Sequence, residues 1–399
     1  MDGGLILAIG TITGLLAQKI RVPDVAVFLI VGMLIGPQAL GLIDIKADSA
    51  LNQIVLLFGA SYVLFDGGAS LRFSILKQVW ITIVVLATVG VVITAAVTGM
   101  AAYFVLGIPV TTALLLGSAI APTDPATLVP IFRQVKIRDR VAQTVMSESA
   151  FNDATGAILT FAVLAVTMGA GEFSLTSSLL DLLKEAVIGI ISGLVLGYLA
   201  ALLIAHERWA FLMEYAPVVT LVAVIGAYFV ADGLHSSGFM AVFVFGMVIG
   251  NKDSFGFKMD QREQQELDDY VTTNAFIMRL FIFLLLGSQV DFSLMNQYLL
   301  GGVVVVTIFM LIARPMTVFV CALPDRRARW TFGEILFMCW TRETGVIPAA
   351  LAGLLVGMNA PGARVIASVT FIAILMTILI QAPTTKWLGA RLGLLEGKD

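Results

Sequence analysis

An aspartate in a proline-interrupted apolar stretch is the first feature of the sequence that suits ion chemistry. Asp124 follows Thr123, and Pro122 and Pro125 flank the pair. Two prolines three residues apart remove two backbone donors, so we expect the helix to open here and to free carbonyl oxygens beside the carboxylate. Carboxylate, hydroxyl and carbonyl oxygens together are typical of a site for a small cation.

A second acidic group lies in the run Glu-Ser-Ala-Phe-Asn-Asp at residues 148–153. Helical spacing places Ser149 and Asp153 on one face, four residues apart, and Glu148 and Asn152 on the adjoining face. Asp153 has no basic residue within a turn of its own helix. It is therefore a candidate for a carboxylate that holds either a proton or a small cation, which is the chemistry of exchange.

The composition places these groups in a membrane. Of 399 residues, 59% are hydrophobic and 13% are charged, whereas a soluble domain carries about 25% charged residues. Apolar stretches near the ~20 residues that span a bilayer follow one another along the chain, which predicts an all-α polytopic membrane protein. The sequence has no basic run of five or more residues, so we expect no nucleic-acid partner.

Polar joints divide the chain into thirteen predicted transmembrane spans. Alternate joints separate the basic residues into a set of 18 and a set of three, with three more inside spans. This bias predicts an integral inner or plasma membrane protein with its N-terminus outside and its C-terminus in the cytoplasm. The predicted spans are 4–18, 24–43, 51–69, 78–105, 110–134, 143–169, 182–205, 215–231, 237–250, 273–290, 298–322, 333–357 and 363–388.

Three pairs of similar motifs indicate an internal duplication. Their offsets are 214, 219 and 218 residues, so one duplication accounts for all three. The pairs are Gly32–Gly36 with Gly246–Gly250, Gly68–Ser74 with Gly287–Ser293, and Thr123–Pro130 with Thr341–Pro348.

The duplication relates a first repeat at 4–169 to a second at 215–388, with a linker helix at 182–205. Because seven spans separate equivalent positions, the two repeats are expected to enter the membrane from opposite sides. Inverted repeats whose broken helices cross at the midplane are typical of secondary transporters. Spans 5 and 12 are the predicted broken helices.

The second repeat places Arg342 where the first has Asp124, with Gly345 and Pro348 as its helix breakers. Opposite charges at the crossing can neutralise converging helix ends. An ionised group at bilayer depth costs at least ~2.5 to 3.5 kcal/mol, so a buried Glu148 requires a partner. Arg342 is the expected partner, whereas Arg314 and Arg279 are expected to extend or pair near the cytoplasmic ends of their helices.

The Thr123-Asp124 pair, the Glu-Ser-x-x-Asn-Asp run and Arg342 in a late broken helix together resemble the sodium/proton exchangers of the NhaP and NHE type. The resemblance covers essentially the whole chain and implies a thirteen-helix antiporter with a dimerisation side and a mobile six-helix core. Two residues depart from the family pattern: Ala154 and Glu343 stand where glycine is common.

The resemblance also implies roles for individual residues. Asp153 would be the carboxylate that binds the cation and the proton, and Glu148 with Arg342 would form a structural ion pair. The remaining members of the implied Na+ or K+ site are Ser149, Asn152, Thr123 and Asp124.

The sequence therefore predicts an electroneutral antiporter that exchanges Na+ for H+, with K+ or Li+ as the alternative cation, and not an enzyme. A sodium-coupled symporter of a small organic solute on the same fold is the alternative. An intramembrane protease is disfavoured because no Gly-x-Gly-Asp motif occurs, and a channel because no filter of carbonyls or charged rings is evident. We expect no cofactor, the bilayer and the transported ions as partners, and a homodimer.

Overall fold

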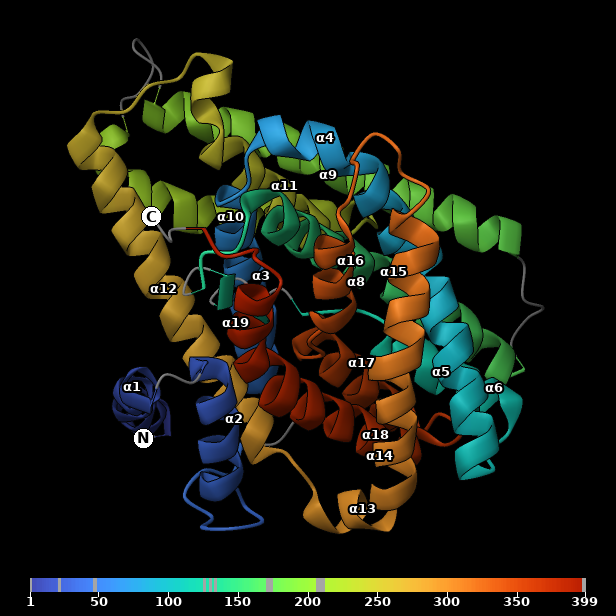
Figure 1. Ribbon diagram of the computed structural model, residues 1–399. Coiled ribbons are helices and arrows are strands. Elements are labelled where there is room, and N and C mark those ends of the chain that lie inside the picture. Colours follow the sequence, from blue (N-terminus) through green and yellow to red (C-terminus); the bar gives the residue numbers. More distant parts are fainter. Residues whose placement is uncertain are drawn as a thin grey trace.

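A computed structural model describes residues 2–20, 23–45, 49–124, 127–128, 131–132, 135–169, 175–205 and 212–396 (Figure 1). Every regular element in these ranges is helical, apart from one isolated bridge between Ile137 and Leu395. The all-helical class is therefore confirmed for the described part of the chain. Pro125, one of the expected helix breakers, lies outside it.

The helices follow the apolar segments of the sequence. Three single π-helical turns interrupt the longer ones, at Leu86–Gly90, Phe309–Ala313 and Thr377–Gln381. The α-helices are α1 (Asp2–Ile20), α2 (Asp24–Ile35), α3 (Ala50–Ala69), α4 (Phe73–Val85), α5 (Val91–Leu106), α6 (Val110–Ile120), α8 (Asp139–Thr167), α9 (Leu175–Ala205), α10 (Ala216–Gly233), α11 (Gly238–Gly250), α12 (Gln261–Ser288), α13 (Phe292–Gln297), α14 (Leu299–Ile308), α15 (Arg314–Ala322), α16 (Phe332–Trp340), α17 (Val346–Gly357), α18 (Ala363–Met376) and α19 (Ala382–Arg391).

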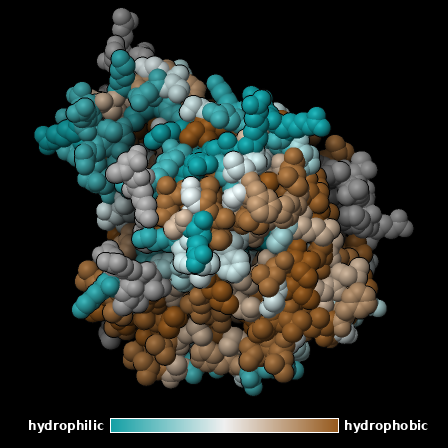
Figure 2. Space-filling model, in the orientation of Figure 1, coloured by the Kyte–Doolittle hydropathy of each residue, from teal (hydrophilic) through white to brown (hydrophobic). Residues whose placement is uncertain are grey.

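Eight helical segments of the described chain are long and apolar enough to cross a membrane, and five shorter apolar helices accompany them. In Figure 2 hydrophobic residues cover most of the body, while hydrophilic residues gather towards the upper end, where α12 begins. The protein is therefore an integral membrane protein. The eight segments are Ala50–Ala69, Phe73–Leu106, Asp139–Thr167, Leu183–Ala205, Met213–Gly233, Gln261–Ser288, Leu299–Ala322 and Ala363–Arg391.

Glycines let two pairs of helices approach closely. A Cβ on Gly32 of α2 would overlap the backbone of α12, and one on Gly287 of α12 would overlap that of α2. Likewise, a Cβ on Gly68 of α3 would overlap the backbone of α11, and one on Gly246 of α11 would overlap that of α3. Small residues at such contacts bring helix backbones together where lipid gives no hydrophobic driving force.

Two interrupted segments meet near the centre of the bundle. The first stops at the end of α6, and the second is the extended stretch 341–345 between α16 and α17. The backbone N–H of Asp124 donates to the carbonyl oxygen of Glu343 at 2.9 Å, so the two breaks touch each other. In Figure 1 α16 and α17 lie near the middle of the molecule, and both contact α8.

Candidate functional site

Helix α8 carries the candidate site into the interior. Glu148, Ser149, Asn152 and Asp153 are all buried, each at most 2% exposed. One turn further on, a Cβ at Gly156 would overlap the ring of Pro122, so glycine lets the first break lie directly against α8. The helical spacing that groups these side chains in the sequence also groups them in space.

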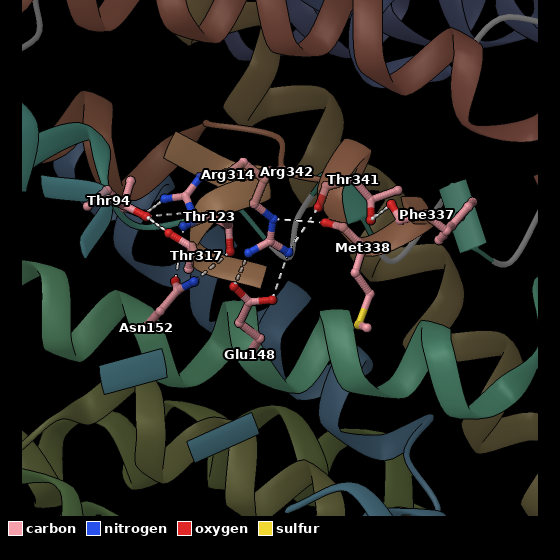
Figure 3. Close-up of polar contacts among 11 residues, drawn as sticks. Thr94, Thr123, Glu148, Asn152, Arg314, Thr317, Phe337, Met338, Thr341 and Arg342 are labelled. Carbon is pink, nitrogen blue, oxygen red and sulfur yellow. Dashed lines mark hydrogen bonds and ion pairs between the residues drawn. The ribbon is translucent and has the colours of Figure 1, made fainter. Parts of the chain in front are cut away.

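Thr123 and Asn152 bind each other through a pair of hydrogen bonds (Figure 3). The Thr123 N–H donates to Asn152 Oδ1 at 3.0 Å, and Asn152 Nδ2 donates to Thr123 Oγ1 at 2.8 Å. The amide of Asn152 thus holds the first break in place.

Asp124 lies between the two breaks. Its Oδ2 accepts a hydrogen bond from Thr127 Oγ1 at 2.8 Å. The carboxylate packs so closely on Gly345 that a Cβ at that position would overlap it. Gly345 of the second break therefore fixes the position of the Asp124 carboxylate, which is part of the first break.

Substitution of Gly345 by alanine tests this contact. We expect Gly345→Ala to lower the exchange rate roughly 10-fold or more, because the added methyl group must displace the Asp124 carboxylate. Gly353→Ala in the same helix is the matched control, since a Cβ there meets nothing within 4 Å. Exchange in reconstituted vesicles measures both, and equal rates for the two variants would contradict the assigned contact.

Asp153 is a buried carboxylate without a hydrogen-bond partner among the described residues. Both of its carboxylate oxygens and the nearby hydroxyl of Ser149 are unpartnered there. Asp153 and Asp124 lie close enough for their charges to interact. An unpartnered carboxylate costs free energy in a low-dielectric interior, so it gains from binding either a proton or a cation.

The structure pairs Glu148 with Arg314, and the expected pair with Arg342 is wrong. The two carboxylate oxygens of Glu148 accept from Arg314 Nη1 at 2.5 Å and Nη2 at 2.9 Å (Figure 3). Arg314 also donates to the carbonyl oxygens of Met338, at 2.9 Å, and Thr341, at 3.3 Å. A bidentate ion pair with further hydrogen bonds to carbonyl oxygens is the form in which buried charges are tolerated.

Arg314 is therefore an internal group, whereas the sequence predicted that it would extend or pair near a helix end. It is fully buried at the start of α15, directly after a π-helical turn. Arg279, in contrast, forms the expected kind of local pair, because its Nη2 lies 3.7 Å from Asp24 Oδ2.

Arg342 has a different set of partners. Its guanidinium donates to the carbonyl oxygen of Ala121 and to Thr94 Oγ1, the latter at 3.3 Å, and it lies 4.8 Å from the ring centre of Phe309. It thus binds the C-terminal end of α6, whose free carbonyls attract a cation. Arg342 stabilises the first break directly rather than through Glu148.

Glu343 stands where the family commonly has glycine, and the sequence assigns it no role. It is fully buried, and its two carboxylate oxygens have no hydrogen-bond partner in the described residues. Its backbone carbonyl accepts a hydrogen bond across the crossing, from the N–H of Asp124. The structure therefore joins Thr123 to Asn152 of α8 and places Glu343 beside Asp124, whose charge interacts with that of Asp153.

Comparison with known proteins identifies the family of this site. Residues 4–391 match the family described as "Sodium/hydrogen exchanger, transmembrane". The chain belongs to the sodium/hydrogen exchanger family. It is 31% identical to "Na(+)/H(+) antiporter 1" of Methanocaldococcus jannaschii, covering 97% of this chain and 93% of that protein.

Two further similarities span nearly all of this exchanger. It is 30% identical to "K(+)/H(+) antiporter NhaP" of Alkalimonas amylolytica over 99% of this chain and 68% of that protein. A solved structure of the sodium proton antiporter of Methanocaldococcus jannaschii at pH 8 superposes with a TM-score of 0.78 at 29% identity, covering 98% of this chain and 97% of the other. Membership of the family therefore rests on sequence and fold together.

Proposed function

We propose that this exchanger is an electroneutral secondary antiporter that moves one monovalent cation against one H+, with Na+ as the first candidate and K+ or Li+ as alternatives. The relatives are named as Na+/H+ and K+/H+ antiporters, which favours antiport over sodium-coupled symport of a solute. The observation that carries the proposal is Asp153, a buried carboxylate whose oxygens have no hydrogen-bond donor among the described residues.

In the proposed cycle the cation and the proton compete for Asp153. Asp124, Ser149 and Thr123 would supply further oxygens to the cation, and Asn152 would hold Thr123 in position. Binding of either ligand removes the uncompensated charge that would otherwise oppose movement of the core across the low-dielectric membrane. The proposed cycle uses no cofactor, because each step only replaces a bound proton with a bound metal cation, or the reverse.

The proposed stoichiometry predicts transport that is insensitive to voltage. Glu148 is neutralised by Arg314 in a bidentate pair, so a single competed carboxylate leaves the loaded core with the same net charge in both directions. Reconstituted vesicles under Na+, K+ and Li+ gradients, with and without a valinomycin-clamped potential, measure this. A voltage-driven current would show that a second group carries protons.

Competition at one carboxylate also fixes the direction of the pH effect. Lowering the pH is expected to raise the apparent KM for the cation, because protons then occupy the same site, while the maximal rate at saturating cation changes less. Initial rates over a matrix of cation concentration and pH give both constants. An apparent KM that ignores pH would contradict a shared site.

The inverted repeats belong to the same proposal, and the two glycine contacts support them. The motif alignment equates Gly32 with Gly246 and Gly68 with Gly287. The contact of α2 with α12 therefore becomes the contact of α11 with α3 when the repeats are exchanged. A pseudo-two-fold relation between 4–169 and 215–388 accounts for this symmetry.

The helices that flank the crossing add support. The π-helical turn at Phe309–Ala313 lies 223 positions after the one at Leu86–Gly90. Thr94 and Thr317 are also 223 positions apart, and their hydroxyl oxygens lie 3.0 Å from each other. Equivalent residues in mutual contact are what a pseudo-two-fold axis between these two segments requires.

We further propose thirteen membrane crossings, an outside N-terminus, a cytoplasmic C-terminus and a homodimer. Each of the thirteen sequence ranges contains one of the described helices or a helical part of it. The distribution of basic residues supports the orientation. Cysteine labelling of single sites from either side of the membrane tests the orientation, and mass photometry of the purified protein tests the dimer.

A further inference from the structure

The loop at residues 323–331, between α15 and α16, presents three exposed arginines beside an apolar surface. Arg326, Arg327 and Arg329 are exposed, and none of them forms an ion pair within the described chain. The exchange mechanism does not use them. Their charge is available to a ligand from outside the protein.

Asp325, the only acidic residue in this loop, is hydrogen-bonded within the protein. Asp325 Oδ2 accepts from the hydroxyl of Thr82 on α4 at 2.6 Å and from its N–H at 3.2 Å. Its Oδ1 accepts from the N–H groups of Arg327 and Ala328, at 3.0 and 3.1 Å. Four donors therefore hold a carboxylate that is only 7% exposed, and it forms no ion pair with the arginines among the described residues.

The same contacts make the loop a fixed platform. Trp330 Nε1 donates to Thr82 Oγ1 at 2.9 Å, and the guanidinium of Arg140 lies 4.4 Å from the centre of the Trp330 ring. Arg140 Nη2 also donates to the carbonyl oxygen of Ala328 at 2.6 Å. Arg329 adopts a φ of 48°, a backbone conformation that non-glycine residues hold only where their surroundings fix it.

Apolar side chains continue from the arginines along the outside of the molecule. Leu323 is 57% exposed and Phe332 is 67% exposed, one at each end of the loop. Trp80 and Val84 of α4 are also exposed, four residues apart on one helical face. Figure 2 shows the hydrophilic upper rim, where this loop lies, directly above a hydrophobic surface that includes α15.

We propose that this arginine platform binds the headgroup of an anionic phospholipid, with its acyl chains on the apolar surface of α15 and α4. Guanidinium groups bind phosphate oxygens through paired hydrogen bonds. Basic residues at the edge of a membrane-spanning segment attract acidic lipids. A lipid is favoured over a soluble anion because the charge is continuous with a lipid-facing apolar surface. Since α16 leads directly from this loop to the crossing at 341–345, a bound lipid would stabilise the helix that precedes Arg342.

Lipid retention and thermal stability of the purified full chain test the proposal. Native mass spectrometry and melting temperature are measured after addition of phosphatidylglycerol, phosphatidylcholine or inorganic phosphate. Phosphatidylglycerol is expected to be retained and to raise Tm, and Arg326→Gln/Arg327→Gln/Arg329→Gln is expected to weaken its binding about tenfold or more. The charge-preserving triple Arg→Lys variant is expected to bind phosphatidylglycerol more weakly than the parent protein and more tightly than the Arg→Gln variant. It keeps the charge but loses the paired donors of the guanidinium.

A control variant removes the same number of exposed charges elsewhere, at Lys258, Arg262 and Lys386, each to glutamine. It is expected to bind phosphatidylglycerol within about twofold of the parent protein. Equal losses in the control and the Arg→Gln variant would overturn the proposal in favour of diffuse attraction. Equal binding of phosphatidylcholine, or equal stabilisation by inorganic phosphate, would also overturn it. None of these readouts measures transport, so the outcome is independent of the proposed exchange.

Discussion

Asp153→Asn is expected to abolish cation-dependent proton exchange while the protein stays folded. The substitution keeps the shape of the side chain but removes the charge for which the cation and the proton compete. Because the Asp153 oxygens have no hydrogen-bond partner among the described residues, no structural bond is broken. Vesicle exchange and the melting temperature in detergent are the two measurements, and only the first is expected to fall.

Asp139→Asn on the same helix is the matched control. Asp139 lies at the start of α8, is 45% exposed in its side chain and faces Arg72 at 3.4 Å. Surface ion pairs contribute about 0 to 1 kcal/mol, so this variant is expected to keep both exchange and stability. Substantial exchange by a folded Asp153→Asn protein would remove Asp153 from the transport site.

Local rules of the sequence group the candidate residues of the first repeat into two sets. Ser149 and Asp153 are separated by one helical turn, and Thr123 and Asp124 lie where a proline ends a helix, so local rules decide their placement. Asn152 was predicted at the site, but its role in holding Thr123 depends on a contact between two helices. Helical periodicity groups residues on a face and does not state what that face touches.

The partner of Glu148 could not be predicted for a related reason. Arg314 and Arg342 both lie in apolar stretches of the second repeat, and the duplication drew attention to Arg342 alone. A π-helical turn at Phe309–Ala313 precedes Arg314. Such a turn shifts the angular position of every later side chain, so a 3.6-residue period cannot give the face on which Arg314 lies. An arginine in an apolar stretch, followed directly by Pro315, was the signal available in the sequence.

Glu148→Gln and Arg314→Gln are each expected to lower the stability of the protein by ~3 to 5 kcal/mol, because either change leaves one buried charge unpaired. Arg314 is the more damaging of the two to remove, since its guanidinium also binds the carbonyls of Met338 in α16 and Thr341 in the second break. Thermal unfolding in detergent, followed by tryptophan fluorescence, measures the losses. Exchange is expected to fall with them, because Arg314 then no longer links Glu148 of α8 to the end of α16.

A double-mutant cycle separates this ion pair from its neighbour. Glu148→Gln/Arg314→Gln is expected to be less destabilised than the two single losses added together, because the second change removes the charge that the first left unpaired. The matched cycle pairs Glu148→Gln with Arg342→Gln, whose guanidinium binds Ala121 and Thr94 instead. Coupling should be clearly larger in the first cycle than in the second. Two results would contradict the Glu148–Arg314 pair: additive losses of stability in the first cycle, or stronger coupling in the second. The second result would identify Arg342 as the partner of Glu148.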